Sequence, residues 1–277
     1  MAPRIEDRPS PNSGPRKNGW SRPELIVLHY TAMDGGAEPA IKRLCMPETE
    51  VSAHYVIGPD GAVFRLVPEE LRAWHAGAGR WGDCWDLNSK SIGIELANDG
   101  ISPFAARQMD ALESLMGAVM ARHGIGPEAV IGHSDSAPGR KADPGGRFDW
   151  RRLARAGLAI WPESRPGDAP CRDGFRRQAR IAGYTAQVDD DTLLEAVRLR
   201  FRPGAEGPLA AADMAVVSEL AARWPVAPSD PPARPEPTRH RRERRAVPAD
   251  TPPELLHEAD DTHADAPALE RAAAARG

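Results

Sequence analysis

The sequence predicts an α/β fold of the α+β kind, in which helices flank a mixed central β-sheet. Short apolar runs typical of buried strands alternate with amphipathic helical patterns as far as about Trp161. The segment that follows carries helical patterns only, and after Trp224 there are no aromatic residues and proline, alanine and charged residues dominate. We therefore expect a sheet domain, then a small three-helix module, then a disordered C-terminal tail.

Four segments are expected to supply the strands. Glu24–Tyr30 is a short apolar run with His29 next to its end. His54–Val67 holds a Pro-Asp-Gly turn between two β-prone runs, where Gly61 tolerates a positive φ, so a hairpin is expected. Ser91–Ala97 is a third apolar run, and Ala129–Asp135 is a fourth that again contains a histidine.

Helices are expected between and after these strands. The first lies around Glu38–Cys45. Ser102 as cap and Pro103 in the first turn predict the start of a second helix, which runs to His123 with apolar residues at i, i+3 and i+4 spacing. A third lies around Asp149–Gly157. These elements set the expected organisation: a sheet domain at 10–162, a linker at 163–171, a helical module at 172–226 and a disordered tail at 227–277.

Composition excludes several classes of function. The chain has 277 residues with 36 Lys+Arg against 40 Asp+Glu, a formal net charge of −4, so we expect no nucleic-acid partner. No apolar run approaches the roughly 20 residues that span a bilayer, and the N-terminus lacks the apolar core of a secretory signal. Cys45, Cys84 and Cys171 are too few for a disulfide framework. We expect a cytoplasmic protein, with the periplasm or cell envelope as the alternative.

Two histidines lie at strand ends and an aspartate follows one of them. His29 ends the first apolar run, His133 follows the fourth, and Asp143 comes ten residues later in a Pro/Gly-rich loop that can fold back. Two imidazoles and one carboxylate are the ligand set of an open zinc site, whose fourth position holds water. The alternative is that each histidine is a satisfied structural residue, and spacing alone does not decide between the two.

Four ordered motifs add a resemblance. They are LHYTA at 28–32, SAHYVIGPDGAVFRLVPEELRAWHAG at 52–77, LNSKSIGIELAN at 87–98 and IGHSDSAPGRKADPG at 131–145. In order and approximate spacing they resemble the zinc-dependent N-acetylmuramoyl-L-alanine amidases, the family that includes AmpD-type and AmiD-type enzymes, phage lysozyme-type amidases and peptidoglycan recognition proteins. The resemblance covers roughly Ser10 to Trp161.

The resemblance implies a metal site and two catalytic side chains. It makes His29, His133 and Asp143 the ligands of one zinc ion, and the aspartate is similar to the AmpD and AmiD branch. Glu95 matches the catalytic acid of the family and as a general base would move a proton from water to the leaving amine. Lys141 matches the lysine that stabilises the developing oxyanion. The alternatives are a strand-end glutamate that faces solvent and a plain surface lysine.

The same motifs suggest residues that contact the substrate. His75, with Trp74 beside it, is expected to line the substrate groove, and a purely structural histidine is the alternative. Asn88 and Arg140 are expected to meet the peptide or its carboxylates, and solvated loop positions are the alternative. Ala53 is a departure, because phage-type enzymes carry a catalytic tyrosine there, and this favours Glu95 with Lys141 as the catalytic pair.

The implied activity is hydrolysis of the amide bond between N-acetylmuramic acid, in its 1,6-anhydro form, and L-alanine of the stem peptide, in peptidoglycan recycling. The partner would be a muropeptide or peptidoglycan fragment. The module at 172–226 resembles, more weakly, the peptidoglycan-binding domain of the AmiD branch, with a generic helical appendage as the alternative. Two other functions stay open: an envelope or phage amidase that degrades polymeric peptidoglycan, and a non-catalytic peptidoglycan sensor.

Overall fold

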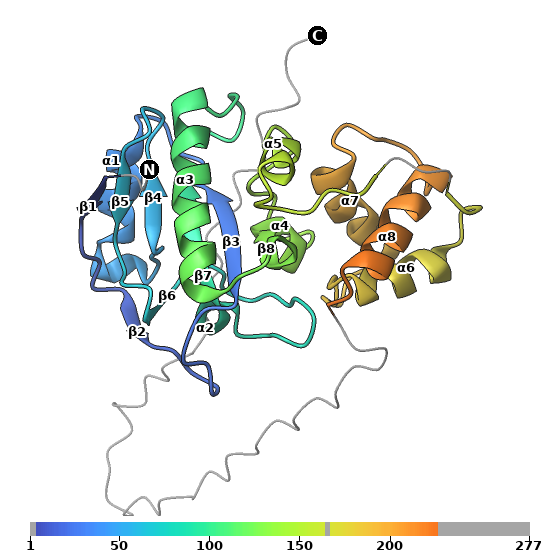
Figure 1. The fold of residues 1–277 in the computed structure, drawn as a ribbon, viewed down its shortest axis with the longest axis horizontal. Coiled ribbons are helices and arrows are strands. Elements are labelled where there is room, and N and C mark those ends of the chain that lie inside the picture. Colours follow the sequence, from blue (N-terminus) through green and yellow to red (C-terminus); the bar gives the residue numbers. More distant parts are fainter. Residues whose placement is uncertain (1–3, 164–166, 227–277) are drawn as a thin grey trace, which may run out of the picture. The chain divides into compact units, whose positions relative to one another are not determined.

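The computed structural model describes residues 4–163 and 167–226. The expected tail at 227–277 and part of the expected linker lie outside the described residues. The central element is a six-stranded mixed sheet (Figure 1) in which only β4 and β5 pair antiparallel. Its strands, in spatial order, are β1 (Ile5–Asp7), β5 (Val63–Arg65), β4 (Tyr55–Ile57), β7 (Ser91–Leu96), β3 (Leu25–Tyr30) and β8 (Val130–Gly132). The predicted mixed sheet is confirmed.

The hairpin and two short strand pairings complete the β-structure. Strands β4 and β5 form the predicted hairpin, and Gly61 in its turn has φ 88°. A two-stranded antiparallel sheet pairs β2 (Ser13–Pro15) with β6 (Leu71–Ala73). The sequence analysis missed β1, β2 and β6, because strands of three residues that contain charge or proline carry no periodic signal.

The helices expected around Glu38–Cys45 and Asp149–Gly157 are confirmed, and two short helices, at 87–90 and 133–136, were not predicted. The strand expected at Ala129–Asp135 ends at Gly132, because a helical turn begins at His133. The helices are α1 (Ala37–Leu44), α2 (Leu87–Lys90), α3 (Ala106–His123), α4 (His133–Ser136), α5 (Trp150–Arg155), α6 (Arg172–Ile181), α7 (Asp190–Phe201) and α8 (Ala211–Arg223), with 3₁₀ turns η1 (Pro47–Thr49) and η2 (Pro127–Ala129). The predicted start of α3 at Ser102 is wrong. The Asp99 carboxylate accepts the hydroxyl and the amide of Ser102 and the amide of Ile101, which makes a separate turn before the helix. Within the described residues, no helix is both long and apolar enough to cross a bilayer.

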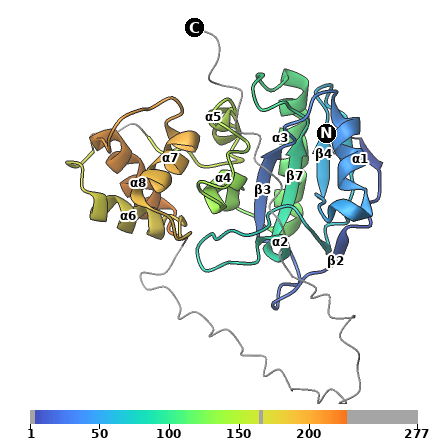
Figure 2. The same ribbon diagram turned by 180° about the vertical axis from the view of Figure 1, so that it is seen from behind.

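The two faces of the sheet are covered differently. Helix α3 crosses one face (Figure 1), where it packs on Ile26 and Leu28 of β3 and on Ile94 of β7. Helix α1 packs on β4 and β5 from the opposite side (Figure 2). Because successive side chains of a strand point to opposite faces, His29 and Glu95 both lie on the face away from α3.

Helices α6, α7 and α8 form the predicted helical module. Their apolar side chains belong to one buried cluster that also contains Val27 of β3 and Ile131 of β8. The cluster includes Phe175 of α6, Val197 of α7 and Leu220 of α8. The module therefore shares its core with the edge of the sheet that carries β3 and β8.

Candidate metal centre and active site

The sheet topology brings His29, His133 and Asp143 together. His29 lies in β3, and His133 begins α4 directly after β8, the parallel neighbour of β3. The loop after α4 folds back, because the Ser134 amide donates to the Asp143 carbonyl at 2.9 Å. The Nδ1 atoms of the two histidines are 3.1 Å apart, and the Asp143 Oδ2 lies 2.8 Å from His29 Nδ1 and 3.1 Å from His133 Nδ1. These three buried residues form a group that could hold a metal ion.

The proton on each of these imidazoles can be assigned from its partners. The Nε2 of His133 lies 2.9 Å from the Ala76 carbonyl, which only accepts, and 3.4 Å from the Arg140 guanidinium, which only donates; the shorter contact assigns the proton to this nitrogen. For His29 the assignment passes through His75 and Ser91. The Ser91 hydroxyl donates to the Leu87 carbonyl at 2.5 Å, so its oxygen accepts from His75 Nε2 at 3.2 Å.

The other nitrogen of His75 must then accept. His75 Nδ1 lies 3.0 Å from His29 Nε2, so His29 donates there and keeps a lone pair on Nδ1. Burial lowers the pKa of His29 to about 4, so its imidazole is neutral at pH 7. Two nitrogen lone pairs and a carboxylate oxygen therefore face one another, an arrangement that a metal cation satisfies.

Glu95 stands next to this group. It pairs in register with His29 on the neighbouring strand β7, and its side chain lies on the same face of the sheet. Its Oε2 is buried and has no hydrogen-bond partner among the described residues. Burial, and after it the charge of Asp143, raise the pKa of Glu95 to about 8, and nearby Lys141 opposes this shift. Lys141 itself is exposed, two residues before Asp143.

His75 packs on His29, one of the three residues that could hold the metal ion. Its ring is 5.1 Å from that of His29 between centroids, and it lies over Gly93 of β7, where a Cβ would come within 2.4 Å of the ring. The absence of a side chain at Gly93 is thus what lets His75 reach His29. The expected role of His75 as a substrate contact stays a prediction, and the contacts observed are with His29 and Ser91.

The other expected substrate contacts have structural partners. Asn88 is buried, and its Oδ1 accepts the amides of His75 at 2.9 Å and Ala76 at 2.8 Å. The Arg140 guanidinium donates to the carbonyls of Ala76 and Ala78. The expected roles of Asn88 and Arg140 as substrate contacts stay predictions, and the contacts observed hold the segment that carries His75. Trp74 precedes this segment and is partly exposed.

Several residues around the site were not singled out by the sequence analysis. Ser91 orients His75, and Asp135 lies in the same helical turn as His133. Asp135 is bonded to Tyr184 and Arg200 of the helical module, far away along the chain. A carboxylate two residues after His133 was visible in the sequence, but nothing there connected it to the module.

Comparisons with known proteins agree with this geometry. The family model described as N-acetylmuramoyl-L-alanine amidase matches residues 19–146. The 1,6-anhydro-N-acetylmuramyl-L-alanine amidase AmpD of Enterobacter cloacae is 34% identical over 131 residues, which are 47% of this chain and 69% of that protein. The chain belongs to the N-acetylmuramoyl-L-alanine amidase family. The N-acetylmuramoyl-L-alanine amidase AmiD of Escherichia coli is 37% identical over 161 residues, 52% of this chain and 57% of that relative, so the match spans little more than half of AmiD.

Solved structures of this amidase family extend the likeness. The Escherichia coli AmiD complex with the substrate anhydro-N-acetylmuramic acid-L-Ala-D-gamma-Glu-L-Lys has a TM-score of 0.67 and 30% identity, and covers 76% of this chain and 93% of that chain. AmpDH3 of Pseudomonas aeruginosa in complex with anhydromuramic pentapeptide has a TM-score of 0.66 and 32% identity. The match covers 76% of this chain and 95% of the AmpDH3 chain. A structure of an AmpD derivative covers only 58% of this chain. The AmiD and AmpDH3 matches therefore extend into the helical module.

Proposed function

We propose that this chain is a zinc-dependent N-acetylmuramoyl-L-alanine amidase. It would hydrolyse the amide bond between N-acetylmuramic acid and L-alanine of the stem peptide. The observation that carries the proposal is the convergence of His29, His133 and Asp143 beside Glu95, whose buried Oε2 has no hydrogen-bond partner among the described residues, in a member of this family.

The three-ligand group fits zinc in donor type and in spacing. Ligand atoms around a tetrahedral zinc at roughly 2.0–2.1 Å lie about 3.3 Å apart. The three donor atoms are separated by 2.8, 3.1 and 3.1 Å, slightly less than that spacing. Three protein ligands leave the fourth position open, as in catalytic zinc sites. When bound there, the ion supplies Lewis-acid activation of water and of the amide carbonyl.

Glu95 is proposed to move the proton. A general acid–base group works best when its pKa lies near the working pH, and burial gives Glu95 a pKa of about 8. Its carboxylate would accept a proton from the attacking water and return it to the leaving amine. Lys141, an exposed cation close enough to influence Glu95, would stabilise the negative charge that develops on the carbonyl oxygen.

The proposed substrate is an anhydro-muropeptide, and the proposed compartment is the cytoplasm. Ligands of this kind are bound in the AmiD and AmpDH3 structures. Cys45, Cys84 and Cys171 are all free, which suits a reducing compartment. Cell fractionation followed by immunoblotting tests the location, and recovery in the envelope fraction would contradict it.

For the module we propose a peptidoglycan-binding role at 172–226, after a catalytic domain at 10–162 and a linker at 163–171. The AmiD and AmpDH3 matches, which reach into this segment, support the proposal. Co-sedimentation of the full chain with intact sacculi, in the presence of chelator to prevent cleavage, is the test. Absence of sedimentation would overturn the binding role.

The reaction itself is tested by mass spectrometry of the products. The zinc-loaded protein is incubated with anhydro-muropeptide and, separately, with intact sacculi, each with and without chelator. Chelator-sensitive release of free stem peptide from the small substrate alone supports the recycling reaction. Release from sacculi would assign the protein to polymeric peptidoglycan, and no release from either substrate would overturn the amidase proposal.

A further inference from the structure

Asp135 links the metal-ligand turn to the helical module. It is the third residue of α4, the four-residue helix that begins with His133, and it is completely buried. Its Oδ2 accepts the Gly132 amide at 2.8 Å and the Arg200 guanidinium at 2.7 Å. Its Oδ1 accepts the Tyr184 hydroxyl at 2.6 Å. Two of its three partners therefore come from the module.

Arg200 reaches the sheet domain from α7. It is 3% exposed, its Nη2 donates to the Val130 carbonyl of β8 at 3.0 Å, and its guanidinium lies 4.1 Å from the centroid of Trp150. It thus contacts β8 before His133 and, through Asp135, the helix turn after it. Burial of Tyr184, together with the charge of Asp135, raises the pKa of the tyrosine, so its hydroxyl keeps the proton that it donates.

A second contact joins the module to the same turn. The Gly82 amide donates to the Gly183 carbonyl at 2.9 Å, and the Thr185 hydroxyl donates to the Gly82 carbonyl at 2.6 Å. In the same loop, the Arg80 amide donates to the carbonyl of Ser136, the last residue of α4, at 2.7 Å. The module thus supports both the loop and the turn that it covers.

We propose that Arg200 and Tyr184 are positioning residues for the metal ligand His133, so that the helical module completes the metal centre in addition to any role in wall binding. They act through Asp135, whose carboxylate ties the first turn of α4 to the end of β8. The module thereby fixes the direction in which His133 Nδ1 points. This inference rests on metal binding by His29, His133 and Asp143 as proposed above.

Helix α7 contains a matched control. Arg198 lies two residues before Arg200, and residues two apart project from nearly opposite sides of a helix. Like Arg200, Arg198 is buried, and it pairs with the buried Asp213 at 2.6 Å. Asp213 accepts the backbone amide of Ala210 at the start of α8. This contact is similar to the one by which Asp135 accepts the backbone amide of Gly132 at the start of α4.

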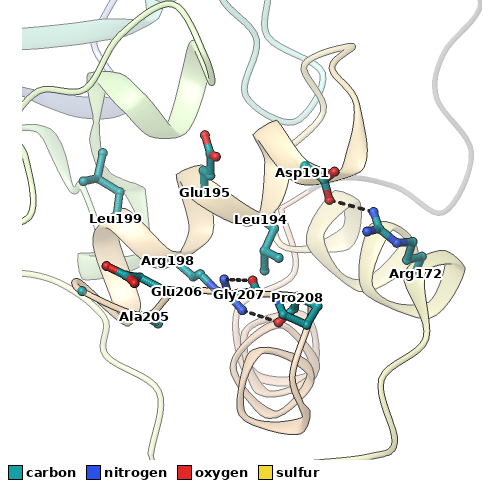
Figure 3. A pocket seen from close by; sticks show the side chains of 11 residues that line it. Arg172, Asp191, Leu194, Glu195, Arg198, Leu199, Ala205, Glu206, Gly207 and Pro208 are labelled. Atoms are coloured by element: carbon teal, nitrogen blue, oxygen red, sulfur yellow. Dashed lines mark hydrogen bonds and ion pairs between the residues drawn. The ribbon is translucent and has the colours of Figure 1, made fainter. Parts of the chain in front are cut away.

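All three partners of Arg198 among the described residues, namely Asp213, Gly207 and Pro208, lie within the module. Figure 3 shows the Arg198 guanidinium bonded to the loop carbonyls of Gly207 and Pro208. These residues line a pocket of about 640 Å³, which is also lined by the Arg172–Asp191 ion pair. Loss of Arg198 therefore removes a buried ion pair from the module, where Arg202 still pairs with Asp213, without changing any contact of Asp135.

The test measures metal affinity in the full-length chain. Zinc affinity is determined by competition with a chromophoric chelator, and the visible spectrum of the Co²⁺-loaded protein reports ligand geometry. Arg200→Met is expected to weaken zinc binding about tenfold, a typical effect of residues that orient metal ligands, and to change the Co²⁺ spectrum. Tyr184→Phe, which keeps the ring packing on Trp81, is expected to weaken it several-fold. Arg198→Met is expected to lower the melting temperature and leave zinc affinity and the spectrum unchanged.

Each outcome has one meaning. Wild-type zinc affinity and spectrum in both Arg200→Met and Tyr184→Phe would overturn the inference, as would an equal loss of affinity in Arg198→Met. Asp143→Ala is measured alongside. If it retains zinc, the proposed metal centre itself is wrong, whereas its loss of zinc combined with unchanged Arg200 and Tyr184 variants would overturn only the role of the module.

Discussion

The two histidines of the proposed metal centre are held in different ways. His29 lies within β3, between two neighbouring strands, and its outer nitrogen is bonded to the side chains of His75 and, through it, Ser91. His133 lies just past β8, at the edge of the sheet, and its outer nitrogen is bonded to the backbone carbonyl of Ala76. The sheet positions the backbone of His29, whereas loops and the helical module position that of His133.

This difference implies that the two proposed ligands are oriented in two different ways. On the His29 side the orientation depends on a short chain of side-chain hydrogen bonds inside the sheet domain. On the His133 side it depends on a folded-back loop and on residues of α7. Substitutions on the first side should change metal binding through the imidazole ring, and those on the second side through the backbone.

The largest effect is expected when either ligand is removed. His29→Ala and His133→Ala should each weaken zinc binding by about a hundredfold or more, since each removes one of three protein ligands. Isothermal titration with zinc measures this. The two histidines differ in how they are held and are both expected to bind the ion. Retention of wild-type zinc affinity by either variant would therefore show that the replaced histidine is not a ligand.

Gly93→Ala should disturb only the His29 side. Its methyl group would lie 2.4 Å from the His75 ring, so the ring must move and the bond to His29 is lost. Zinc affinity should fall about tenfold, and unfolding free energy by about 1–3 kcal/mol. Gly117→Ala is the control, because a Cβ there meets nothing within 4 Å, and it should leave zinc affinity unchanged. Equal affinity in the two variants would contradict the account.

Acid should destabilise the sheet domain through His54, which lies near the His29 side but bonds no ligand. The Gly93 amide donates to its Nδ1 and its Nε2 donates to the Leu71 carbonyl, and burial lowers its pKa to about 3. The unfolded chain binds a proton below about pH 6.5 and the folded chain does not until about pH 3, so stability falls as pH falls between these values.

The size of this effect follows from linkage. His54 alone should lower the unfolding free energy by about 2 kcal/mol between pH 7 and pH 5. Urea denaturation of the metal-free protein at the two pH values measures the change, and His54→Asn, which keeps an acceptor for Gly93, should reduce the slope. Stability that rises toward pH 5 would contradict a neutral, buried His54.

A smaller effect is expected at the end of the hydrogen-bond chain. Ser91→Ala leaves the His75 Nε2 proton without its acceptor, and zinc affinity should fall a few-fold. Ser91→Thr keeps a hydroxyl and should restore affinity. Chelator competition checks both variants, and an alanine variant with wild-type affinity would show that His75 is oriented by packing alone.

The candidate site could be predicted from the sequence mainly through the resemblance of four motifs to the amidase family, whereas the local signals predicted the strands that carry it. The apolar runs before His29 and His133 predict neighbouring buried strands, and the Pro/Gly-rich loop predicts the return of Asp143. The supporting contacts could not be predicted, because they join residues that are distant along the chain. The Arg200–Asp135 pair connects α7 to α4, and neither residue differs in sequence from an exposed charge.

We propose that His29, His133 and Asp143 hold the zinc ion and that Glu95 moves the proton. The direct test compares the zinc content and turnover on anhydro-muropeptide of Glu95→Gln and Asp143→Ala with those of the wild-type chain. Glu95→Gln should bind zinc with wild-type affinity and lose at least about a hundredfold in turnover, since it cannot carry the proton. Asp143→Ala should lose both. Wild-type turnover in Glu95→Gln, or loss of its zinc, would contradict the account.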